Sequence, residues 1–379
     1  PFFLPKGTIV YNILIDYVKN LYQRYSYQEV ITPQIFSTDL WKRSGHYEHY
    51  SENMFFTVVD DREYAIKPMN CPGHAVLYGI GLHSYRDLPL RYADFGRLHR
   101  YERSGVTHGL TRVRTFSQDD AHIFCTPDQI YDEVKSFISM VMESYQVFNF
   151  ESIRINLSLR PDDRVGSEEL WDMAEAKLEE VLTGLDIQFE KLKGEGAFYG
   201  PKIDFFVDDA IGRGWQLGTV QLDFSMPERF DLNYVEENGS YRRPVMIHRA
   251  MLGSIERFMG VLIEHYGGAF PLWLSPVQIV VIPIADRHIE YAKKVGAQFN
   301  SLNFRCNVDS RSERMQSKIR DAELKKIPYM FIVGDREVEM DSVAVRMRDS
   351  TGNGKSQNIG SKTIEQVIQI IAGETGKQV

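Results

Sequence analysis

The 379-residue sequence has little cysteine, no long apolar run and no excess of positive charge. Its three cysteines are far apart and form no CxxC pair, which argues against a disulfide framework and for a reducing compartment. An apolar run such as VQIVVIPIA, near Val280, is about half of the roughly 20 residues that a membrane span needs, so we predict a soluble cytoplasmic protein, with an organellar form left open. The formal net charge of -8 does not exclude nucleic acid, because binding depends on where positive charge is concentrated.

Two motifs of common enzyme classes are also missing. No strand–GxxxxGK–helix unit occurs, and the GEG of GEGAFYGPKIDFFVDD is too short for a phosphate loop. No HExxH motif occurs, which argues against a hydrolytic zinc enzyme. The sequence starts at Pro1, without Met and within apolar residues, so we expect a piece excised from a longer chain.

Length and composition predict two or three globular domains. A hydrophobic share of 43% and an aromatic share of 12% exclude a disordered chain. The segment GGAFPLWLSP, residues 267–276, has the composition of a linker. Beyond it, strand and helix patterns alternate, which predicts a separate three-layer α/β domain. We therefore place one domain at residues 1–270 and a second at 271–379.

Three helices are predicted in the first 190 residues. Apolar residues recur with helical spacing over residues 7–25, and the strand pattern that follows is interrupted by Pro33, which suits an edge or an interface. Thr126 and Gln129 form a capping box around Pro127, which starts a helix with an apolar face. Ser167 caps a further helix that ends near residue 185.

Residues 91–124 predict two strands joined by a polar loop, and this stretch is rich in arginine. Guanidinium groups mounted on paired strands suit a ligand with several anionic oxygens, such as a nucleotide, although a salt-bridged surface ribbon explains the pattern equally well. The arginines are Arg91, Arg97, Arg100, Arg103, Arg112 and Arg114.

A strand running into a helix is predicted over residues 243–268, and Arg257 lies in the first turn of that helix. A cation there opposes the helix dipole, so a bound anion explains it, while the alternative is a solvent-facing arginine paired with Glu256 or Glu264. Earlier, GRGWQLGTVQLDF predicts a strand in which Gly218 marks a bulge that re-aims Gln216 and Thr219.

Two segments carry histidine and cysteine without a clear metal spacing. In SGHYEHYSENMFF we interpret His46 and His49 as loop residues. In KPMNCPGH, Cys71 and His74 lie around a predicted Pro-Gly turn, and the pair admits both a zinc-binding and a purely structural explanation. Several basic residues after the linker are either ordinary surface charge or contacts to an RNA backbone: Arg305, Arg311, Arg314, Lys318, Arg320, Lys325 and Lys326.

Taken in order, the motifs resemble those of class II aminoacyl-tRNA synthetases. KPMNCPGH, GLTRVRTFSQDDAHIFC, GEGAFYGPKID and PVMIHRAMLGSIERF are similar to the threonyl-tRNA synthetase family in particular. The resemblance implies an α+β catalytic domain, with an antiparallel sheet flanked by helices, followed by a smaller α/β anticodon-binding domain. It also implies activation of threonine with ATP to threonyl-adenylate and pyrophosphate, then transfer to the terminal adenosine of tRNA(Thr). Homodimerisation through the first helix and the Pro33 strand is a further implication.

The resemblance implies a role for residues from distant segments. Cys71, His122 and His248 are the expected ligands of one Zn²⁺ per subunit, which recognises the amino and hydroxyl groups of threonine, whereas His74 is not a ligand. The other expected threonine contacts are Gln118, Asp120 and Tyr199. The expected ATP contacts, with Mg²⁺, are Arg100, Glu102, Arg112, Phe116, Gln216, Thr219, Gln221 and Arg257, with Lys202 beside the pocket. Arg100 and Arg257 are expected to be catalytic, with His46 as a proton acceptor, and the expected anticodon contacts are Arg320, Glu337 and Arg346.

Two other functions fit parts of this pattern. A catalytically inactive paralogue would bind RNA as a regulator, but such proteins usually lose the phosphate arginines or the metal ligands, and both sets are present here. A class II synthetase for proline or serine is disfavoured by the Cys-His-His set. Serine keeps the hydroxyl and amine of threonine, and no HxxxH editing module is present, so we expect proofreading of serine to come from elsewhere.

Overall fold

A computed structural model describes residues 1–209, 211–349 and 356–375. The chain forms two compact units, one of Pro1 with Leu14–Leu262 and one of Phe2–Ile13 with Ile263–Val379. Among the described residues, no helix combines the length and the apolar character that crossing a membrane requires.

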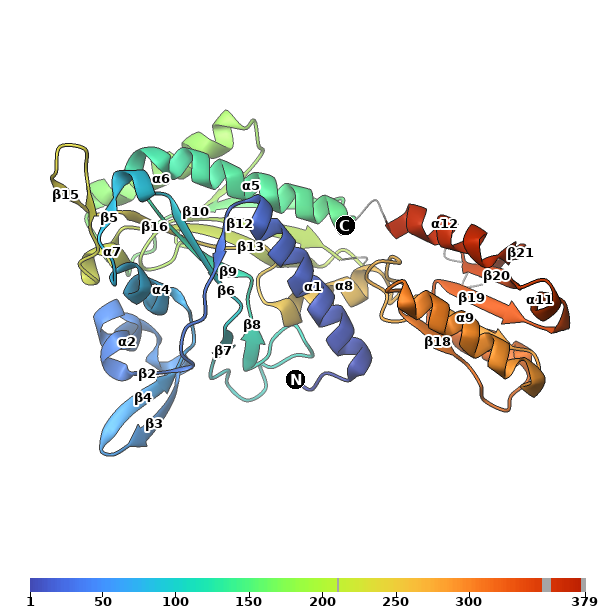
Figure 1. Ribbon diagram of the computed structural model, residues 1–379. Helices are drawn as coiled ribbons and strands as arrows, with labels where there is room; N and C mark the ends of the chain where they lie inside the picture. Colours follow the sequence, from blue (N-terminus) through green and yellow to red (C-terminus); the bar gives the residue numbers. More distant parts are fainter. Residues whose placement is uncertain (210, 350–355, 376–379) are drawn as a thin grey trace. The chain divides into compact units, whose positions relative to one another are not determined.

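The first unit is built on an eight-stranded sheet that is antiparallel except at its two edges (Figure 1). In spatial order its strands are β1 (Gln28–Glu29), β6 (Leu90–Asp94), β9 (Asp120–Cys125), β16 (Val245–Ala250), β13 (Gly214–Asp223), β12 (Lys202–Asp208), β10 (Ile153–Ser158) and β11 (Glu190–Leu192). Only β1 with β6 and β10 with β11 run parallel. The predicted antiparallel sheet flanked by helices is confirmed.

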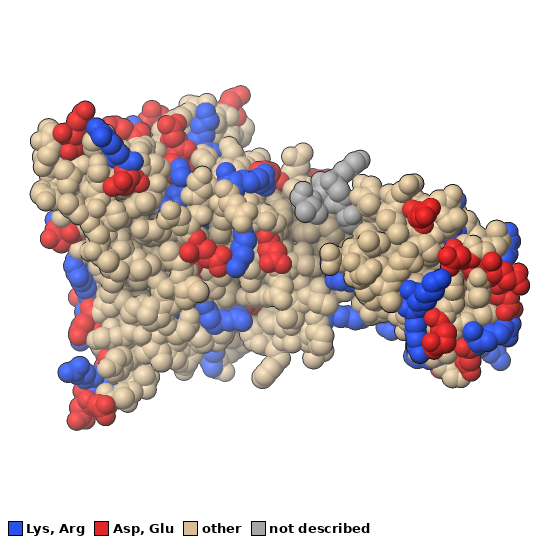
Figure 2. Space-filling model, in the orientation of Figure 1, with Lys and Arg blue, Asp and Glu red and all other residues tan. Residues whose placement is uncertain are grey.

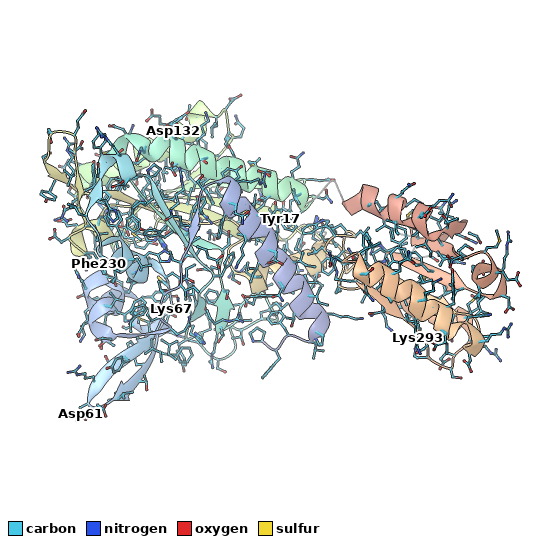
Figure 3. The ribbon with its side chains drawn as sticks, in the orientation of Figure 1. Tyr17, Asp61, Lys67, Asp132, Phe230 and Lys293 are labelled. Carbon is cyan, nitrogen blue, oxygen red and sulfur yellow. The ribbon has the colours of Figure 1, made fainter. Side chains whose placement is uncertain are left out.

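Two long helices, α5 (Ile130–Val147) and α6 (Glu168–Gly184), pack on each other beside this sheet (Figure 1). Both predicted N-termini are confirmed. Thr126 and Gln129 make the capping box, although the first turn is a 3-10 turn, Pro127–Gln129, and the Ser167 side chain accepts a hydrogen bond from the amide of Leu170. The predicted first helix is α1 (Pro5–Arg24), whose Tyr17 donates to Ser144 of α5 (Figure 3).

Several short strands and helices precede β6 in the sequence. Three strands, β2 (Ile35–Ser37), β3 (Phe55–Val59) and β4 (Arg62–Ile66), form a small sheet, and three short helices accompany it: α2 (Thr38–Ser44), α3 (His46–Tyr50) and α4 (Cys71–Tyr78). A further short helix and a three-stranded sheet follow elsewhere in the unit: α7 (Ser225–Arg229), β5 (His83–Ser84), β14 (Tyr234–Val235) and β15 (Tyr241–Arg242).

Two predictions about these short elements are wrong. His46 and His49 belong to helix α3, because Gly45 has a φ of 81° that ends α2 and lets a new helix start at once. Cys71 begins helix α4 and is not part of a Pro-Gly turn. Proline is well accommodated in a first helical turn, where its missing N–H costs nothing, so Pro72 lies in the first turn of a helix where we expected a Pro-Gly turn.

The arginine-rich stretch forms two nested antiparallel pairs. β6 pairs with β9, and the short strands β7 (Arg97–His99) and β8 (Thr115–Ser117) pair beyond them. The bulge predicted at Gly218 is confirmed, because the register between β12 and β13 shifts at this point: Phe205 opposes Gly218 and Phe206 opposes Gln216, which leaves Leu217 as the extra residue. A Cβ at Gly218 would lie 2.9 Å from the Tyr145 hydroxyl, so a larger residue does not fit.

The second unit has a five-stranded sheet in the order β18 (Cys306–Val308), β17 (Ile279–Pro283), β19 (Tyr329–Val333), β20 (Ser342–Arg348) and β21 (Ser356–Thr363). The first three strands are parallel, as the strand–helix alternation predicts. Alternate residues of β17 pack into two separate apolar clusters, one against α9 (Ile289–Ser301) and α12 (Ile364–Thr375) and one against α10 (Met315–Leu324). The predicted three-layer arrangement is thus confirmed, and α11 (Asp335–Glu339) completes the unit.

Several basic residues of this unit have partners within it. Arg305 donates to the carbonyls of Trp273 and Ser275, Arg311 pairs with Asp309 and Asp321, and the buried Lys318 donates to the Pro283 carbonyl. On the face shown in Figure 2, basic and acidic side chains are interspersed over the unit. These three residues therefore stabilise the fold, whatever else the unit binds.

Candidate active site

Sheet register brings two of the three expected metal ligands together. His122 of β9 and His248 of β16 occupy directly opposed positions on paired strands, and their Nε2 and Nδ1 atoms are 3.0 Å apart. Cys71, the first residue of α4, completes the group. One ligand atom from each residue lies within 4.8 Å of the other two.

All three side chains of this group are buried. Burial raises the pKa of the Cys71 thiol well above its usual range, and burial together with the neighbouring His248 lowers the pKa of His122 well below its own. Without a cation the thiol therefore keeps its proton, and His122 is neutral. One thiol and two imidazoles are a donor set that suits Zn²⁺, and three protein ligands leave a coordination position open, as in catalytic sites. The residues present fit the expected metal.

Each histidine of the group is held by a further buried side chain. The Nε2 atom of His248 donates to Asp223 across 2.8 Å, and the Nδ1 atom of His122 lies 2.8 Å from Nδ1 of His74. Sequence reasoning missed Asp223 and discarded His74. The signal for Asp223 was that it is the one charged residue in the strand GWQLGTVQLD, and in the structure it has no exposed surface.

The expected threonine contacts divide between this group and a neighbouring pocket. Asp120 lies 3.9 Å from Nε2 of His122 and accepts a hydrogen bond from Asn70, and burial raises its pKa to about 6. Tyr199 packs 5.0 Å from the His248 ring and donates to Gln221. Gln221, which we expected at the nucleotide, therefore bonds to Tyr199 beside the metal ligands.

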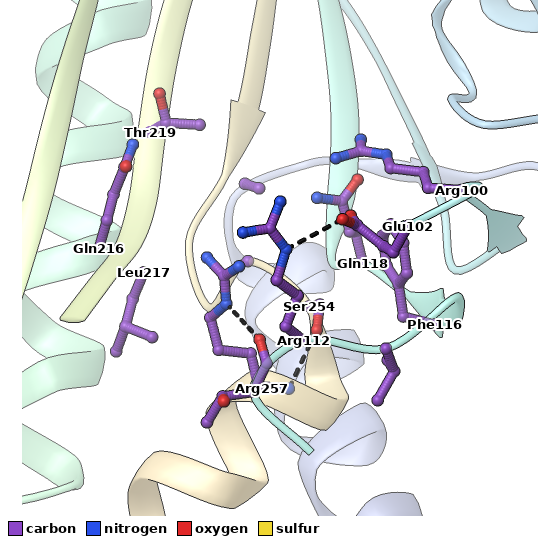
Figure 4. A pocket seen from close by; sticks show the side chains of 14 residues that line it. Arg100, Glu102, Arg112, Phe116, Gln118, Gln216, Leu217, Thr219, Ser254 and Arg257 are labelled. Atoms are coloured by element: carbon purple, nitrogen blue, oxygen red, sulfur yellow. Dashed lines mark hydrogen bonds and ion pairs between the residues drawn. The ribbon is translucent and has the colours of Figure 1, made fainter. Parts of the chain in front are cut away.

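A pocket opens between strand β13, the segment that follows β7 and the start of helix α8 (Ile255–His265) (Figure 4). Most of the expected ATP contacts line it, together with one expected threonine contact: Arg100, Glu102, Arg112, Phe116, Gln118, Gln216, Thr219 and Arg257. Three other hairpin arginines have partners outside the pocket: Arg91 bonds Glu133, Arg97 bonds Glu256 and Arg103 bonds Glu52. Arg114 does not line the pocket but donates to the backbone carbonyl of Glu102.

Three arginines give the pocket its electrostatic character (Figure 4). Arg112 is paired with Glu102 at 2.9 Å, Arg257 donates to the Thr111 carbonyl, and Arg100 stacks 5.0 Å from the Phe116 ring. Burial, aided by the charges of Arg100 and Arg112, lowers the pKa of Arg257. Mutually repelling cations around one pocket favour a polyanionic ligand, because its oxygens relieve the repulsion.

Buried acids fix the elements that carry these arginines. Glu256 has no exposed surface; it pairs with Arg97 at 2.7 Å and accepts from the amide of Ser117, which ties α8 to the β7–β8 pair. Asp119 accepts from the amides of Met251 and Leu252 and so holds the turn before α8. In that turn Gly253 has a φ of 72°, and a Cβ there would lie 2.7 Å from the Leu217 carbonyl oxygen.

A buried carboxylate also positions the pocket-lining residues of β13, and sequence reasoning missed it. Asp204 of β12 accepts from Gln216 at 2.6 Å and from Thr219 at 3.0 Å, and the expected pocket neighbour Lys202 pairs with it at 2.9 Å. The bulge beside Gly218 places both polar side chains of β13 within reach of this one acid.

His46, which we interpreted as a loop residue, is buried in helix α3. Its ring packs on Trp41 and Phe198, its Nδ1 lies 2.8 Å from the Ser44 hydroxyl, and its Nε2 lies 3.8 Å from Sγ of Cys71. Burial lowers the pKa of His46 to about 3, so the ring is neutral.

The three expected anticodon residues lie on three different elements of the second unit, and two of them have hydrogen-bond partners there. Arg320 is exposed on α10. Glu337 of α11 accepts from the amide of Gly334 and the hydroxyl of Ser361, and Arg346 of β20 donates to Ser356.

Comparison with known proteins agrees with this architecture. Residues 56–266 match the model of the tRNA synthetase class II core domain (G, H, P, S and T), and residues 278–373 match that of the anticodon binding domain. The chain is 50% identical over 376 residues to a threonine–tRNA ligase of Alkalilimnicola ehrlichii, and 51% identical over 374 residues to one of Natranaerobius thermophilus; each alignment covers 99% of this chain and 58% of the relative.

A solved structure extends the comparison to three dimensions. The crystal structure described as the RNA binding domain of threonyl-tRNA synthetase from Cryptosporidium parvum Iowa II superposes with a TM-score of 0.93 at 45% identity, covering 98% of this chain and 92% of that one. The chain spans 58% of the length of the curated relatives named above. It belongs to the class II tRNA synthetase family, with a core domain and an anticodon-binding domain similar to those of threonine–tRNA ligases.

Proposed function

We propose that this chain is the catalytic and anticodon-binding part of a threonine–tRNA ligase. It would activate threonine with ATP and then transfer the threonyl group to the terminal adenosine of tRNA(Thr). The convergence of Cys71, His122 and His248 carries the proposal, because this group adjoins a pocket of arginines in the same unit. The names of the relatives support the amino acid and the tRNA.

In the activation step, a carboxylate oxygen of threonine attacks the α-phosphorus of ATP. A carbon–oxygen–phosphorus link forms, the bond from the α-phosphorus to the bridging oxygen breaks, and pyrophosphate leaves with its electrons. We assign Arg100 to the α-phosphate, and Arg112 and Arg257 to the outer phosphates, which ATP brings with Mg²⁺. Their fixed charges stabilise the developing negative charge, and no bond to the protein forms.

The remaining pocket residues position the nucleoside. Phe116, over which Arg100 already stacks, offers a face for adenine, and Glu102 accepts from its amino group. Gln216 and Thr219 serve the ribose from the opposite wall, held by Asp204. We keep Gln221 among the adenosine contacts, although its bond to Tyr199 ties it to the threonine side.

Cys71, His122 and His248 would hold one Zn²⁺ per subunit, which supplies open coordination positions for the amino and hydroxyl groups of threonine. Asp120 accepts the hydrogen bond of the substrate hydroxyl, and Gln118 and Tyr199 hold the rest of the amino acid. Valine matches threonine in shape but lacks the hydroxyl, so a site built on that group rejects it strongly. His46, neutral and buried near Cys71, is proposed as proton acceptor in the transfer step.

The alternative of an inactive RNA-binding paralogue is less consistent with these observations. A regulator has no need of three arginines around one pocket or of three buried metal-type donors. Both groups remain in this chain and lie in one unit.

Amino-acid-dependent exchange of pyrophosphate into ATP, measured together with the zinc content, tests the proposal. We expect threonine to give the fastest exchange, serine a weaker one and valine none, with one zinc per chain. Proline as the preferred substrate, or full activity in zinc-free protein, would overturn the assignment.

We propose tRNA binding by the second domain, residues 271–379, with Arg320, Glu337 and Arg346 near the anticodon, and a cytoplasmic location. We also propose a homodimer formed through α1 and the Pro33 segment. Ile31 and Ile35, on either side of Pro33, are 87% and 52% exposed, and a partner would cover them. Light scattering at micromolar concentration should give twice the chain mass, and a monomer would contradict the dimer.

A further inference from the structure

We call Cys71, His122 and His248 the metal-type group. Each of its two histidines contacts a buried side chain through the ring nitrogen that points away from the group, and the two partners differ in their chemistry. Behind His248 is a carboxylate, Asp223, which accepts from Nε2 and leaves Nδ1 toward the group. Behind His122 is another imidazole, that of His74, and the contact is Nδ1 to Nδ1 at 2.8 Å. His74 has no exposed surface, and the assigned function gives it no role.

We propose that His74 is a positioning residue for metal binding: it accepts the Nδ1–H hydrogen bond of His122 and thereby keeps the Nε2 lone pair of His122 on the metal. This inference rests on the proposed function, since it requires a metal at the Cys71 group. The protons follow from the geometry. A ring that binds a cation through Nε2 has no proton there, so neutral His122 carries its proton on Nδ1 and donates it.

His74 must then accept through Nδ1 and carry its own proton on Nε2. The surroundings favour this tautomer, because Nε2 of His74 lies 4.0 Å from Oδ2 of Asp94. Asp94 is itself fixed by the fully buried Lys67, at 3.3 Å, and by the hydroxyl of Thr32, at 2.8 Å (Figure 3 labels Lys67). An anion held on that side attracts an N–H and repels a lone pair, so Asp94 selects the tautomer of His74 and His74 selects that of His122.

Helix α4 places the two relevant residues together. Cys71 and His74 are three positions apart on one helix and so lie on the same face. Between them, Gly73 lets the helix approach Thr32 closely, since a Cβ there would lie 3.1 Å from the threonine methyl group. Helix α4 thus supplies both Cys71, a member of the metal-type group, and His74, the partner of His122.

Three substitutions separate hydrogen bonding from packing. In His74→Asn the side-chain oxygen is bonded to Cγ, as Nδ1 is in histidine, so it can accept from His122. In His74→Gln the oxygen is one bond farther out, and His74→Leu has no acceptor. The measurements are the Zn²⁺ dissociation constant, by chelator competition, and the visible absorption of the Co²⁺-loaded chain, which reports the coordination geometry.

We expect His74→Leu to weaken Zn²⁺ binding by about 10- to 100-fold, the range for lost partners of metal-bound histidine. His74→Asn should restore most of the affinity and the wild-type Co²⁺ spectrum, and His74→Gln should not. His288→Leu is the matched control, because His288 is also buried and hydrogen-bonded through its ring, in its case to Asp335, but belongs to the second unit. It should leave Zn²⁺ binding unchanged.

Wild-type affinity in His74→Leu, or an equal loss in the Asn and Leu variants, would overturn the proposal. If circular dichroism shows that the Leu variant does not fold, the Asn and Gln variants decide, and equal affinities in those two would overturn it. The wild type separates this inference from the proposed function: a chain that takes up no zinc refutes the metal site itself. A zinc-loaded wild type with an equally loaded Leu variant refutes only the role of His74.

Discussion

The metal-type group and the arginine pocket belong to the same unit but hold their side chains very differently. In the group, His122 and His248 are 1% and 7% exposed, and each ring has its outer nitrogen fixed by a buried partner. In the pocket, the side chain of Arg112 is 51% exposed and is paired with Glu102. A metal ion is bound by donors whose geometry is set in advance, whereas a polyanion is bound by charges that can adjust to it. We therefore expect a substitution in the metal-type group to lower activity more than a substitution of a single residue in the pocket.

The largest effect is expected for Cys71→Ser. Loss of one of three ligands should lower the rate of threonine-dependent pyrophosphate exchange by more than about 100-fold, beyond the loss typical of an outer partner. The far-UV spectrum should be retained, because the sheet packs without the thiolate. Cys125→Ser is the control: Cys125 is equally buried and lies on β9, but it does not belong to the group. A fold lost in step with activity would mean that the metal is structural.

Arg257→Gln should have the next largest effect, a loss on the order of 100-fold in the exchange rate, as for other donors to a developing negative charge. Burial and two like charges already disfavour the charge on Arg257, so its interaction with a polyanion should be strong. Arg103→Gln removes an arginine of the same hairpin that pairs with Glu52 outside the pocket, and it should change the rate little. Similar losses in both variants would contradict the division of the hairpin arginines into pocket and surface members.

The sequence predicted the elements of this fold better than the contacts between them. Capping boxes, strand–helix alternation and the bulge at Gly218 are local, so residues a few positions apart specify them. The metal-type group is not local: His122 and His248 are 126 residues apart, and only their register on paired strands makes them neighbours. Family resemblance supplied that set, because spacing cannot reveal it.

The errors have a related cause. Pro72 and Gly73 were interpreted as a turn from their individual preferences, although Pro72 suits the first turn of a helix and Gly73 lets α4 pack closely against Thr32. His46 was interpreted as a loop residue because its spacing from His49 matches no metal-binding helix, whereas in the structure it lies in helix α3 and packs on Trp41 and Phe198. The roles of His74 and Asp223 depend on which ring nitrogen faces which atom, and the sequence does not contain that information.

Asp209 offers a rigidly held charge outside both regions, and it gives the smallest expected effect. The carboxylate accepts from the amides of Ile211 and Arg213, from the Arg213 side chain and from the Trp215 indole. Burial alone would raise its pKa, but these donors lower it to about 2. The unfolded chain has the ordinary value of about 4, so the stabilisation is complete above pH 4 and is lost as the pH falls toward 2.

Urea unfolding of the wild type and of Asp209→Asn, at several pH values from 5 to 2.5, measures this contribution. The wild type should be more stable by on the order of 1 kcal/mol at pH 5, and the difference should shrink as the pH falls, because the carboxylate of the unfolded chain then takes up a proton while that of the folded chain stays largely ionised. A difference that is constant with pH would mean that the hydrogen bonds are as strong with an amide as with the charge. Holding an ionised group in a fixed position would then add little to the stability of this unit. The large loss of activity expected for substitutions in the metal-type group would have to come from loss of the metal alone.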